Sequence, residues 1–535
     1  MKAQPAKEPA TGADVVVRML EERGTKHIFG VPGGKIDKVF DALQDSTIQT
    51  VVCRHEQNAA FIAGGIGRMT GQAGVAIATS GPGISNLVTG LATANTEGDP
   101  FVALGGAVAV GERLKTVHQS MDSVSMCKPV TKYAAEVDSP SSTAEVLAAA
   151  FRAAESARPG AAFVSLPIDV MSGPARCKPI GLHGFHGQGS AAEASLREAA
   201  RLINASQTPV VFLGLMASKP NVADAVRAFL QQCSMPVVGT FQAAGAVSRQ
   251  LVPYFAGRVG QIANQPADEL LDTADLVLMI GYDPVEYWPA LWNHGRDRTV
   301  VHVDSVPAKI ENDYDPAVEL IGSIEETLQS LIPLLHRPTM EAESKALLAR
   351  INRDREEMMA EAAALSGVPV HPLRLIAELQ DILTPDVTVC SDMGSFSMYL
   401  ARYLYSFRAR QLLISNGQQT LGVALPWGIA ATLVRPNEKV LSISGDGGFL
   451  FSANELETAV RLKSHLVHLI WIDGSYDMVG SQEQLKYNRR SGVNFGPVDV
   501  VKYAEAFGAT GLQIVTRTRS LRFSAKRSIF PVRFW

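Results

Sequence analysis

The chain has 535 residues, enough for three or four domains of about 150 residues each. Its formal net charge is only −4, and this balance gives no sign of binding to nucleic acid or to a membrane surface. No apolar run approaches the ~18 residues of a transmembrane helix, and the N-terminus lacks the apolar core of a signal peptide. The five cysteines have no CxxC spacing, which favours thiols in a reducing cytoplasm over a disulfide framework or a metal site.

Strand and helix patterns alternate through the first third of the chain. The polar residues 1–11 should be mobile, and the amphipathic run ADVVVRMLEERG predicts a helix that ends at Gly24. KHIFGVPGG, TVVCRHEQ, GVAIATSGPG and FVALGGAV each contain a strand pattern, with helical stretches between them. This alternation predicts a doubly wound parallel α/β domain that extends to about residue 185.

A glutamate stands at one of these strand ends. In TVVCRHEQNAAFIAGG, the dipeptide His55-Glu56 lies between the strand pattern and a helix with small residues on one face. A carboxylate in this position can cap the helix or pair with Arg54. The local pattern by itself favours that structural role over a catalytic one.

Residues 190–345 repeat the alternation. PVVFLGL, PVVGTF, ADLVLMIGY and TVVHVD predict strands, and stretches such as VADAVRAFLQQC predict the helices between them. No predicted strand end here carries a clustered acid–base set, and no GxGxxG fingerprint follows a strand. The charged, glycine-poor stretch that follows predicts a connecting helix, placed at 346–370, whose charges form a solvated face.

The most informative stretch, Lys439–Met478, lies in the last predicted domain, 371–535. KVLSIS and LVHLIWI predict two buried parallel strands with a helix between them. Ser452 is the expected N-cap of that helix, and Glu455 follows three residues later, as in a capping box. The stretch is therefore a predicted βαβ unit.

Two aspartates stand where these two strands end. A right-handed crossover places Asp446, in the turn Gly445-Asp446-Gly447-Gly448, and Asp473 above the carboxyl ends of strands in one sheet. Mg²⁺ takes oxygen ligands, and the glycine N–H groups can approach phosphate oxygens because no Cβ intervenes. The stretch thus indicates a Mg²⁺-diphosphate site, while an ordinary glycine turn in a βαβ unit remains the plain alternative.

Several motifs together resemble those of one enzyme family. The GDGG turn, with a second acid one helix and one strand later, is similar to the thiamine diphosphate motif. VPGGKID, RHEQNAAFIAGGIGR, TSGPGISN and NTEGDP resemble the pyrimidine-binding domain of acetolactate synthases, and NGQQTLGVALPWG resembles the catabolic, FAD-independent members. The resemblance implies an α/β fold of three doubly wound parallel-sheet domains: pyrimidine-binding (1–185), central (190–345) and diphosphate- and Mg²⁺-binding (371–535).

The resemblance also implies roles for individual residues. Glu56 matches the glutamate that bonds N1′ of the aminopyrimidine, a proton-sharing task that suits a buried carboxyl with a raised pKa. Gln119 matches a glutamine near the reacting carbon, and Lys35 stands near the mouth of the site, where a cation can hold a pyruvate carboxylate. Taken alone, these two could equally be a loop amide and a surface lysine. Leu421 matches the apolar wedge beneath the cofactor. The implied cofactor contacts are Glu56, Gly394, Ser395, Gln419, Leu421, Gly445, Gly447, Gly448 and Met478, and the implied metal ligands are Asp446, Asp473 and Ser475.

The implied activity is that of an acetolactate synthase of butanediol pathways. Two pyruvates condense to 2-acetolactate and CO₂ through a hydroxyethyl-thiamine diphosphate intermediate, with thiamine diphosphate and Mg²⁺ as cofactors. FAGRVGQIANQPAD and GYDPVEYWPALWN stand where anabolic relatives carry flavin-contacting loops but resemble the flavin-free enzymes, so FAD is not expected. The implied partners are pyruvate and further copies of the chain, in a homodimer or homotetramer with active sites at the dimer interface.

Other readings stay open because fold and cofactor motif do not define a reaction. A pyruvate oxidase, a glyoxylate carboligase or another decarboxylase on the same cofactor would carry the same motifs. A chain that is inactive because its C-terminus is damaged is an alternative of a different kind.

Two segments depart from the family. Asp473-Gly474-Ser475 stands where relatives have Asn-Asn or Asp-Asn-Gly, so oxygen ligands remain but an amide that could brace the loop is lost. From about residue 516 the chain reads TRTRSLRFSAKRSIFPVRFW, with six basic residues and no acid. This tail resembles an altered reading frame or an aberrant terminus more than a nucleic-acid-binding arm. It predicts a missing edge strand and exposed ladder groups.

Overall fold

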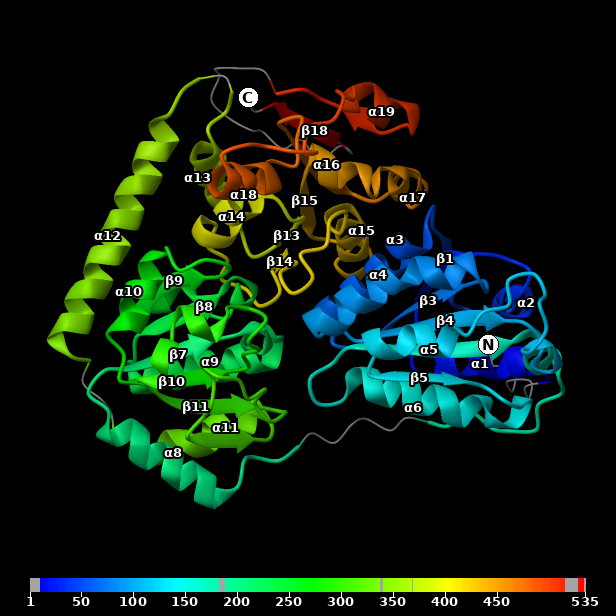
Figure 1. Ribbon diagram of the computed structural model, residues 1–535, viewed down its shortest axis with the longest axis horizontal. Coiled ribbons are helices and arrows are strands. Elements are labelled where there is room, and N and C mark those ends of the chain that lie inside the picture. The colour runs from blue at the N-terminus through cyan, green and yellow to red at the C-terminus, as the bar shows by residue number, and fades with distance from the viewer. Residues whose placement is uncertain (1–9, 182–187, 337–339, 368, 515–527, 534–535) are drawn as a thin grey trace. The chain divides into compact units, whose positions relative to one another are not determined.

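The computed structural model describes residues 10–181, 188–336, 340–367, 369–514 and 528–533, the last of these as backbone only. The described chain forms three six-stranded sheets in which every strand pairs parallel to its neighbours (Figure 1). Two compact units result: the first combines residues before 186 with 425–436 and 452–464, and the second contains the remainder. In the described ranges, no helix has the length and apolar character needed to span a membrane.

The first sheet belongs to the first unit and has the strand order β2-β1-β3-β4-β6-β5. Helices pack on it through apolar side chains that include Val16, Leu20, Leu147 and Phe151, all fully buried. Covered on both faces, its central strands are buried along their length, as expected for a parallel sheet. Its strands are β1 (His27–Val31), β2 (Gln49–Val52), β3 (Gly74–Ala78), β4 (Phe101–Ala107), β5 (Tyr133–Glu136) and β6 (Ala161–Pro167). Its helices are α1 (Gly12–Glu22), α2 (Asp37–Leu43), α3 (Glu56–Thr70), α4 (Pro82–Glu97), α5 (Ser123–Cys127), α6 (Thr143–Glu155) and α7 (Ile168–Ser172).

The second sheet has the order β12-β11-β10-β7-β8-β9, which is typical of dinucleotide-binding folds. The four strands predicted in this region are present, and two further strands, β9 and β12, were not predicted. Its strands are β7 (Pro209–Leu213), β8 (Val237–Thr240), β9 (Phe255–Val259), β10 (Leu276–Ile280), β11 (Thr299–Asp304) and β12 (Val318–Ile321). The helices are α8 (Glu193–Ala205), α9 (Pro220–Cys233), α10 (Pro266–Asp272), α11 (Ile324–Leu331) and the long connecting helix α12 (Ala342–Ala364).

The third sheet has the order β14-β13-β15-β16-β18-β17, so its topology repeats that of the first sheet. Its strands are β13 (Val387–Ser391), β14 (Leu412–Ile414), β15 (Lys439–Gly445), β16 (Leu466–Ile472), β17 (Thr510–Gly511) and β18 (Ser528–Arg533). The helices in this part of the chain are α13 (Pro372–Ile382), α14 (Ser395–Tyr403), α15 (Ala424–Val434), α16 (Asp446–Leu450), α17 (Leu456–Arg461), α18 (Asp477–Tyr487) and α19 (Val500–Ala506).

The tail corrects one expectation from the sequence. The prediction that the tail leaves an edge strand missing is wrong. The backbone of β18 pairs with β16 over six residues and also with β17. Proline at position 531 lacks an N–H donor, so this strand makes a weaker ladder than its length indicates. The basic residues before β18 lie outside the described residues, as does most of the N-terminal segment expected to be mobile.

The predicted helix between β15 and β16 also needs correction. In place of one continuous helix, the chain forms the short α16, a 3-10 turn at Ala453–Glu455 and then α17. Ser452 makes no side-chain capping bond, so the predicted capping box is wrong. Glu455 bonds to another part of the first unit, as described below.

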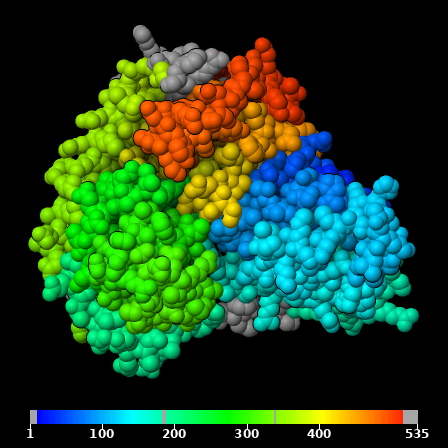
Figure 2. All heavy atoms as spheres, in the orientation of Figure 1, coloured from blue at the N-terminus to red at the C-terminus, as the bar shows by residue number. Residues whose placement is uncertain are grey.

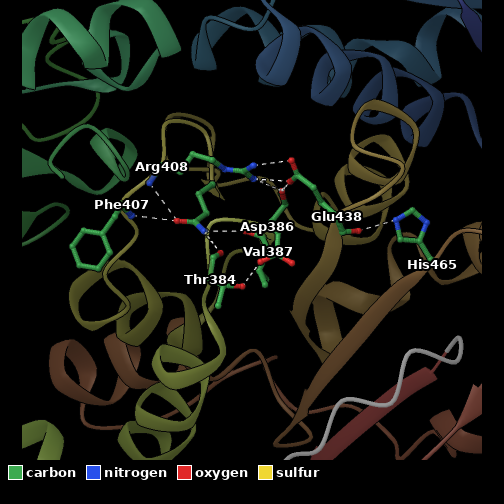
Figure 3. Close-up of polar contacts among 9 residues, drawn as sticks. Thr384, Asp386, Val387, Phe407, Arg408, Glu438 and His465 are labelled. Atoms are coloured by element: carbon green, nitrogen blue, oxygen red, sulfur yellow. Dashed lines mark hydrogen bonds and ion pairs between the residues drawn. The ribbon is translucent and has the colours of Figure 1, made fainter. Parts of the chain in front are cut away.

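A polar network holds the amino ends of the strands of the third sheet (Figure 3). The two terminal guanidinium nitrogens of Arg408 each donate at 2.7 Å to the carboxylate of Glu438, the residue just before β15. The Gln411 amide donates to the carbonyl oxygens of Thr384 and Val387 at 2.7 and 3.1 Å, which joins the starts of β13 and β14. His465, before β16, donates to the Glu438 carbonyl at 2.9 Å. This edge is thus devoted to structure, and the loops at the opposite, carboxyl edge carry the candidate site.

Candidate functional site

Glu56 stands at the carboxyl edge of the first sheet, as the first residue of α3. His55 caps that helix by accepting the N–H of Gln57 at its Nδ1, so the helix does not use the Glu56 carboxylate as its cap. Instead, Glu56 Oε2 accepts a hydrogen bond of 2.9 Å from the Asn86 amide of α4. The side chain is half-buried, whereas the resemblance implied a buried one. The two structural roles that the local pattern favoured, helix cap and partner of Arg54, are therefore replaced by orientation through Asn86.

The loop after β3 brings a second predicted residue to the same edge. Gly81, with a φ of +67°, starts α4 in a backbone conformation that suits glycine, and a Cβ there would lie 3.2 Å from the side chain of Gln119. Ser80 donates to the Gln119 carbonyl at 2.6 Å. Gln119 itself has a φ of +64°, which is uncommon outside glycine and often accompanies function. Its side chain is exposed.

Lys35 reaches the first sheet's carboxyl edge by way of the loop after β1. Its backbone N–H lies 3.4 Å from the Thr79 hydroxyl, and its half-buried side chain belongs to the same group of loops. The structure therefore collects Lys35, Glu56 and Gln119 around the turn at 79–83, although they are far apart in the sequence. This is the edge at which parallel α/β sheets bind ligands.

The second cluster lies at the carboxyl edge of the third sheet. Asp446 begins α16 directly after β15, and its carboxylate accepts the N–H of Gly447 at 2.9 Å and the N–H of Gly474 at 2.8 Å. Asp473 follows β16 and accepts the N–H of Ser475 at 3.0 Å. The predicted parallel pairing is confirmed: β15 and β16 pair in parallel, and both aspartates follow strand ends at one edge.

Electrostatics make this pair of aspartates suitable for a cation. Burial raises the pKa of Asp446, and burial together with the charge of Asp446 raises the pKa of Asp473 to about 6. A divalent cation would offset both effects. A cavity of about 220 Å³ lies beside the two carboxylates. In the described ranges, no group of three or more His, Cys, Asp or Glu side chains could hold a metal, so further ligands would be backbone or water oxygens.

Neighbouring side chains pack closely against the glycines of the turn. A Cβ at Gly447 would lie 2.7 Å from the Tyr476 ring, and a Cβ at Gly448 would lie 2.9 Å from the Asp392 carboxylate. With contacts this short, a side chain at either position would force its neighbour to shift. Glycine at 447 and 448 keeps a Cβ out of the turn, as close approach of a phosphate to this backbone requires.

The remaining predicted contacts lie in loops and helices of the second unit. Gly394 precedes α14, and the Ser395 hydroxyl donates to Asp477 at 2.8 Å, so that hydroxyl is already engaged. Gln419 is exposed with a φ of +49°, and Leu421 is half-buried. Met478 is half-buried in α18, a helix at the surface in the orange region of Figure 2.

Asp392 is a buried residue of this cluster that the sequence did not single out. Its carboxylate is 1% exposed, accepts the Met393 N–H at 2.8 Å and lies 2.9 Å from the Gly422 N–H through each oxygen. It thereby holds the residue directly after Leu421. Burial raises the pKa of Asp392 to about 7, although hydrogen bonds from four backbone N–H groups oppose the shift. The local sequence gave no sign of this role because the bonded loop lies thirty residues away.

Asp392 should make stability depend on pH. Between about pH 4 and about 7, the folded chain keeps a proton that the unfolded chain has lost. The free energy of unfolding should therefore fall as the pH rises through this window, by roughly 1–4 kcal/mol. Urea unfolding across the window measures the fall. Asp392→Asn keeps a carbonyl oxygen for Gly422 and has nothing to titrate, so its fall should be smaller; an equal fall would assign the effect to other groups.

Comparisons with known proteins place the chain among characterised families. Residues 10–126 match the N-terminal TPP binding domain of thiamine pyrophosphate enzymes, residues 196–331 match their central domain, and residues 392–529 match their C-terminal TPP binding domain. The chain is 52% identical to "Acetolactate synthase, catabolic" of Raoultella terrigena over 96% of this chain and 92% of that protein. It is 48% identical to "Acetolactate synthase" of Bacillus subtilis over 94% and 88%, and 31% identical to "Acetolactate synthase isozyme 2 large subunit" of Escherichia coli over 95% and 91%.

Proposed function

The chain belongs to the thiamine pyrophosphate enzymes, and among them to the acetolactate synthases. We therefore propose that its active site combines two parts: the Glu56 cluster, which is Lys35, Glu56 and Gln119, and the Asp446 turn, which is residues 445–448 with Asp473. One observation carries the proposal for the second cluster: a glycine turn and two aspartates lie together at the carboxyl edge of one parallel sheet. The substrate is pyruvate, and the product is 2-acetolactate.

The Asp446 cluster fits a Mg²⁺-diphosphate. Asp446 and Asp473 offer carboxylate oxygens, and the Ser475 carbonyl is the third protein ligand that we propose. Gly447 and Gly448 would let phosphate oxygens approach the start of α16 because no Cβ intervenes, although the Gly447 N–H already bonds to Asp446. The raised pKa values express mainly the cost of burying the two carboxylates and, for Asp473, also the charge of Asp446; a bound cation lowers both costs.

The Glu56 cluster fits the proton management that this reaction needs. Thiamine diphosphate, when bound, supplies the electron sink for decarboxylation of a 2-keto acid. Glu56 would hold a proton opposite the pyrimidine, with Oε2 fixed by Asn86 and Oε1 directed towards Gly83, where a Cβ would lie 3.5 Å away. We further propose that Lys35 binds the carboxylate of pyruvate, that Gln119 bonds near the reacting carbon, and that Leu421 supports the cofactor from below.

We propose that the chain works as a homodimer or homotetramer in which Glu56 of one copy serves the Asp446 turn of another. The support is resemblance to the family, whose members build each site from two chains. None of the five cysteines, all within the described ranges, forms a disulfide, and four are buried, which supports a reducing cytoplasm as the compartment. The relation to a protein named as catabolic supports a place in the formation of acetoin and butanediol.

We propose that catalysis needs no FAD, although the second sheet has a strand order that suits dinucleotides. At its switch point, between β7 and β10, the buried Glu286 carboxylate accepts the N–H of Leu215 at 2.7 Å and the N–H of Asp283 at 3.0 Å. The Thr240 hydroxyl donates to the same carboxylate at 2.6 Å. Glu286 thus already uses N–H groups that a pyrophosphate would need at this position.

Gly474 should accept asparagine but not valine. Its φ is +75°, a region that asparagine tolerates and a β-branched residue does not, and a Cβ there meets nothing within 4 Å. Gly474→Asn should therefore retain Mg²⁺-dependent binding of thiamine diphosphate, whereas Gly474→Val should weaken it about 5- to 30-fold. Fluorescence titration of the cofactor at fixed Mg²⁺ measures both. Equal affinities for the two variants would show that this backbone geometry is not needed.

An assay with pyruvate tests the proposed function. Purified protein should release acetolactate when thiamine diphosphate and Mg²⁺ are both supplied, should lose activity when either is withheld, and should not respond to FAD. A yellow protein that consumes oxygen would indicate a pyruvate oxidase. A folded protein that forms no acetolactate would overturn the assignment of activity.

A further inference from the structure

Glu455 lies far from Glu56 in the sequence but contacts the residues directly before it, within the first unit. Glu455 Oε1 accepts the backbone N–H of Arg54 at 2.8 Å and that of His55 at 3.1 Å. The same oxygen lies 3.3 Å from the Asn58 amide nitrogen, one turn into α3. A single carboxylate oxygen therefore holds the connection between β2 and α3 on both sides of Glu56.

The Glu455 side chain is itself held in place. It is fully buried, and its second oxygen accepts a 2.6 Å hydrogen bond from Thr458, which is also fully buried. No described Lys or Arg side chain pairs with Glu455; its charge is instead compensated by N–H and O–H donors and by the N-terminal end of α3. Burial raises the pKa of this carboxyl, and the surrounding hydrogen bonds oppose the shift.

A neighbouring contact extends this grip to the end of β2. Arg461, the last residue of α17, donates to the carbonyl oxygen of Val52 and also pairs with Glu457 at 3.0 Å. Arg461 and Glu455 together therefore bond to the backbone at three positions of the β2–α3 connection: 52, 54 and 55. A side chain that served only the packing of α17 would not need this series of contacts.

We propose that Glu455 is a positioning residue that fixes the backbone before Glu56 and so aims the Glu56 carboxylate. This inference rests on the proposed role of Glu56. It adds a residue that touches neither substrate nor cofactor and acts through the β2–α3 connection. A buried acceptor of two consecutive N–H groups is costly to lose, because both donors would remain buried without partners.

Three variants distinguish a role of Glu455 in orienting the Glu56 carboxylate from a role in stabilising the fold alone. Glu455→Ala removes the acceptor. Glu455→Gln keeps an oxygen for Arg54 and His55, and its amide can donate to the Thr458 hydroxyl, so it preserves the geometry without the charge. Glu22→Gln, an exposed residue of α1 in the first unit that takes no part in these contacts, is the matched control.

The first measurement is amide hydrogen exchange in the full chain without cofactor. Exchange at Arg54 and His55 should rise at least tenfold in Glu455→Ala and stay near the wild-type rate in the other two variants. The second measurement is kinetic: Glu455→Ala should lower kcat about 10- to 100-fold per folded chain with little change in KM for pyruvate, and Glu455→Gln should recover most of it.

The outcomes separate the inference from the proposed function. Unchanged exchange at Arg54 and His55 in Glu455→Ala would overturn the contact itself. Faster exchange with wild-type kcat would show that the contact is structural only, which also overturns the inference. An active Glu56→Gln enzyme would instead defeat the proposed role of Glu56, and the exchange result would be unaffected.

Discussion

Replacing Glu56 by glutamine should lower the rate of acetolactate formation by about 10²–10⁴-fold, the range that general acid–base catalysis contributes. The substitution keeps the size of the side chain and an oxygen that can accept the 2.9 Å hydrogen bond from Asn86. It removes the ability of Glu56 to exchange a proton with the pyrimidine. Thiamine diphosphate should consequently still bind, with a dissociation constant within about tenfold of the wild-type value.

Two measurements made on the same preparation test this expectation. Initial rates with saturating pyruvate give the loss in kcat, and fluorescence titration gives the affinity for the cofactor. Glu22→Gln, an exposed residue of α1, is the control and should match the wild type in both. Near-normal turnover by Glu56→Gln would remove Glu56 from the mechanism and with it the proposed division of the site.

Local patterns were sufficient for the parts of the site that lie close together in the sequence. The turn at 445–448 and Asp473 are separated by one crossover, and the parallel pairing of β15 with β16 brings them to the same edge of the sheet. Gly474 shows the limit of this reasoning. The sequence presented it as the loss of a bracing amide, whereas its positive φ and its bond to Asp446 make glycine suitable there.

Residues that act over long sequence distances could not be predicted from pattern. Glu455 has the spacing of a capping box with Ser452, yet its partners lie about 400 residues earlier in the chain. Asp392 bonds to a loop that no local rule connects to it. The strand β18 escaped prediction because its segment has no clean period and contains proline, and its partner β16 supplies the pairing. In each case the decisive interaction is tertiary.

Replacing Asp446 by alanine should abolish Mg²⁺-dependent retention of thiamine diphosphate. The change removes a proposed metal ligand and also the acceptor of the Gly447 and Gly474 N–H groups, so the metal loop loses its anchor. Asp446→Asn separates the two effects, because it keeps an oxygen for Gly474 and loses the negative charge. It should retain the loop and still weaken binding of the metal by at least tenfold. Equilibrium dialysis of the cofactor with Mg²⁺ and with chelator measures both, and retention that chelator leaves unchanged would exclude the metal role.

Asp446→Ala, combined with Glu56→Gln, also tests whether each active site is shared between two chains. Glu56→Gln and Asp446→Ala damage different clusters, so a mixed dimer has one site with both defects and one site with neither. Co-expression of the two chains in equal amounts should restore about a quarter of the wild-type activity, since half of the dimers are mixed and each has one intact site. Activity that stays at the level of the single variants would mean that each chain builds its own site. Restored activity would place Glu56 and Asp446 of different copies at one cofactor. Glu455 would then position Glu56 of its own chain for a diphosphate that another chain holds.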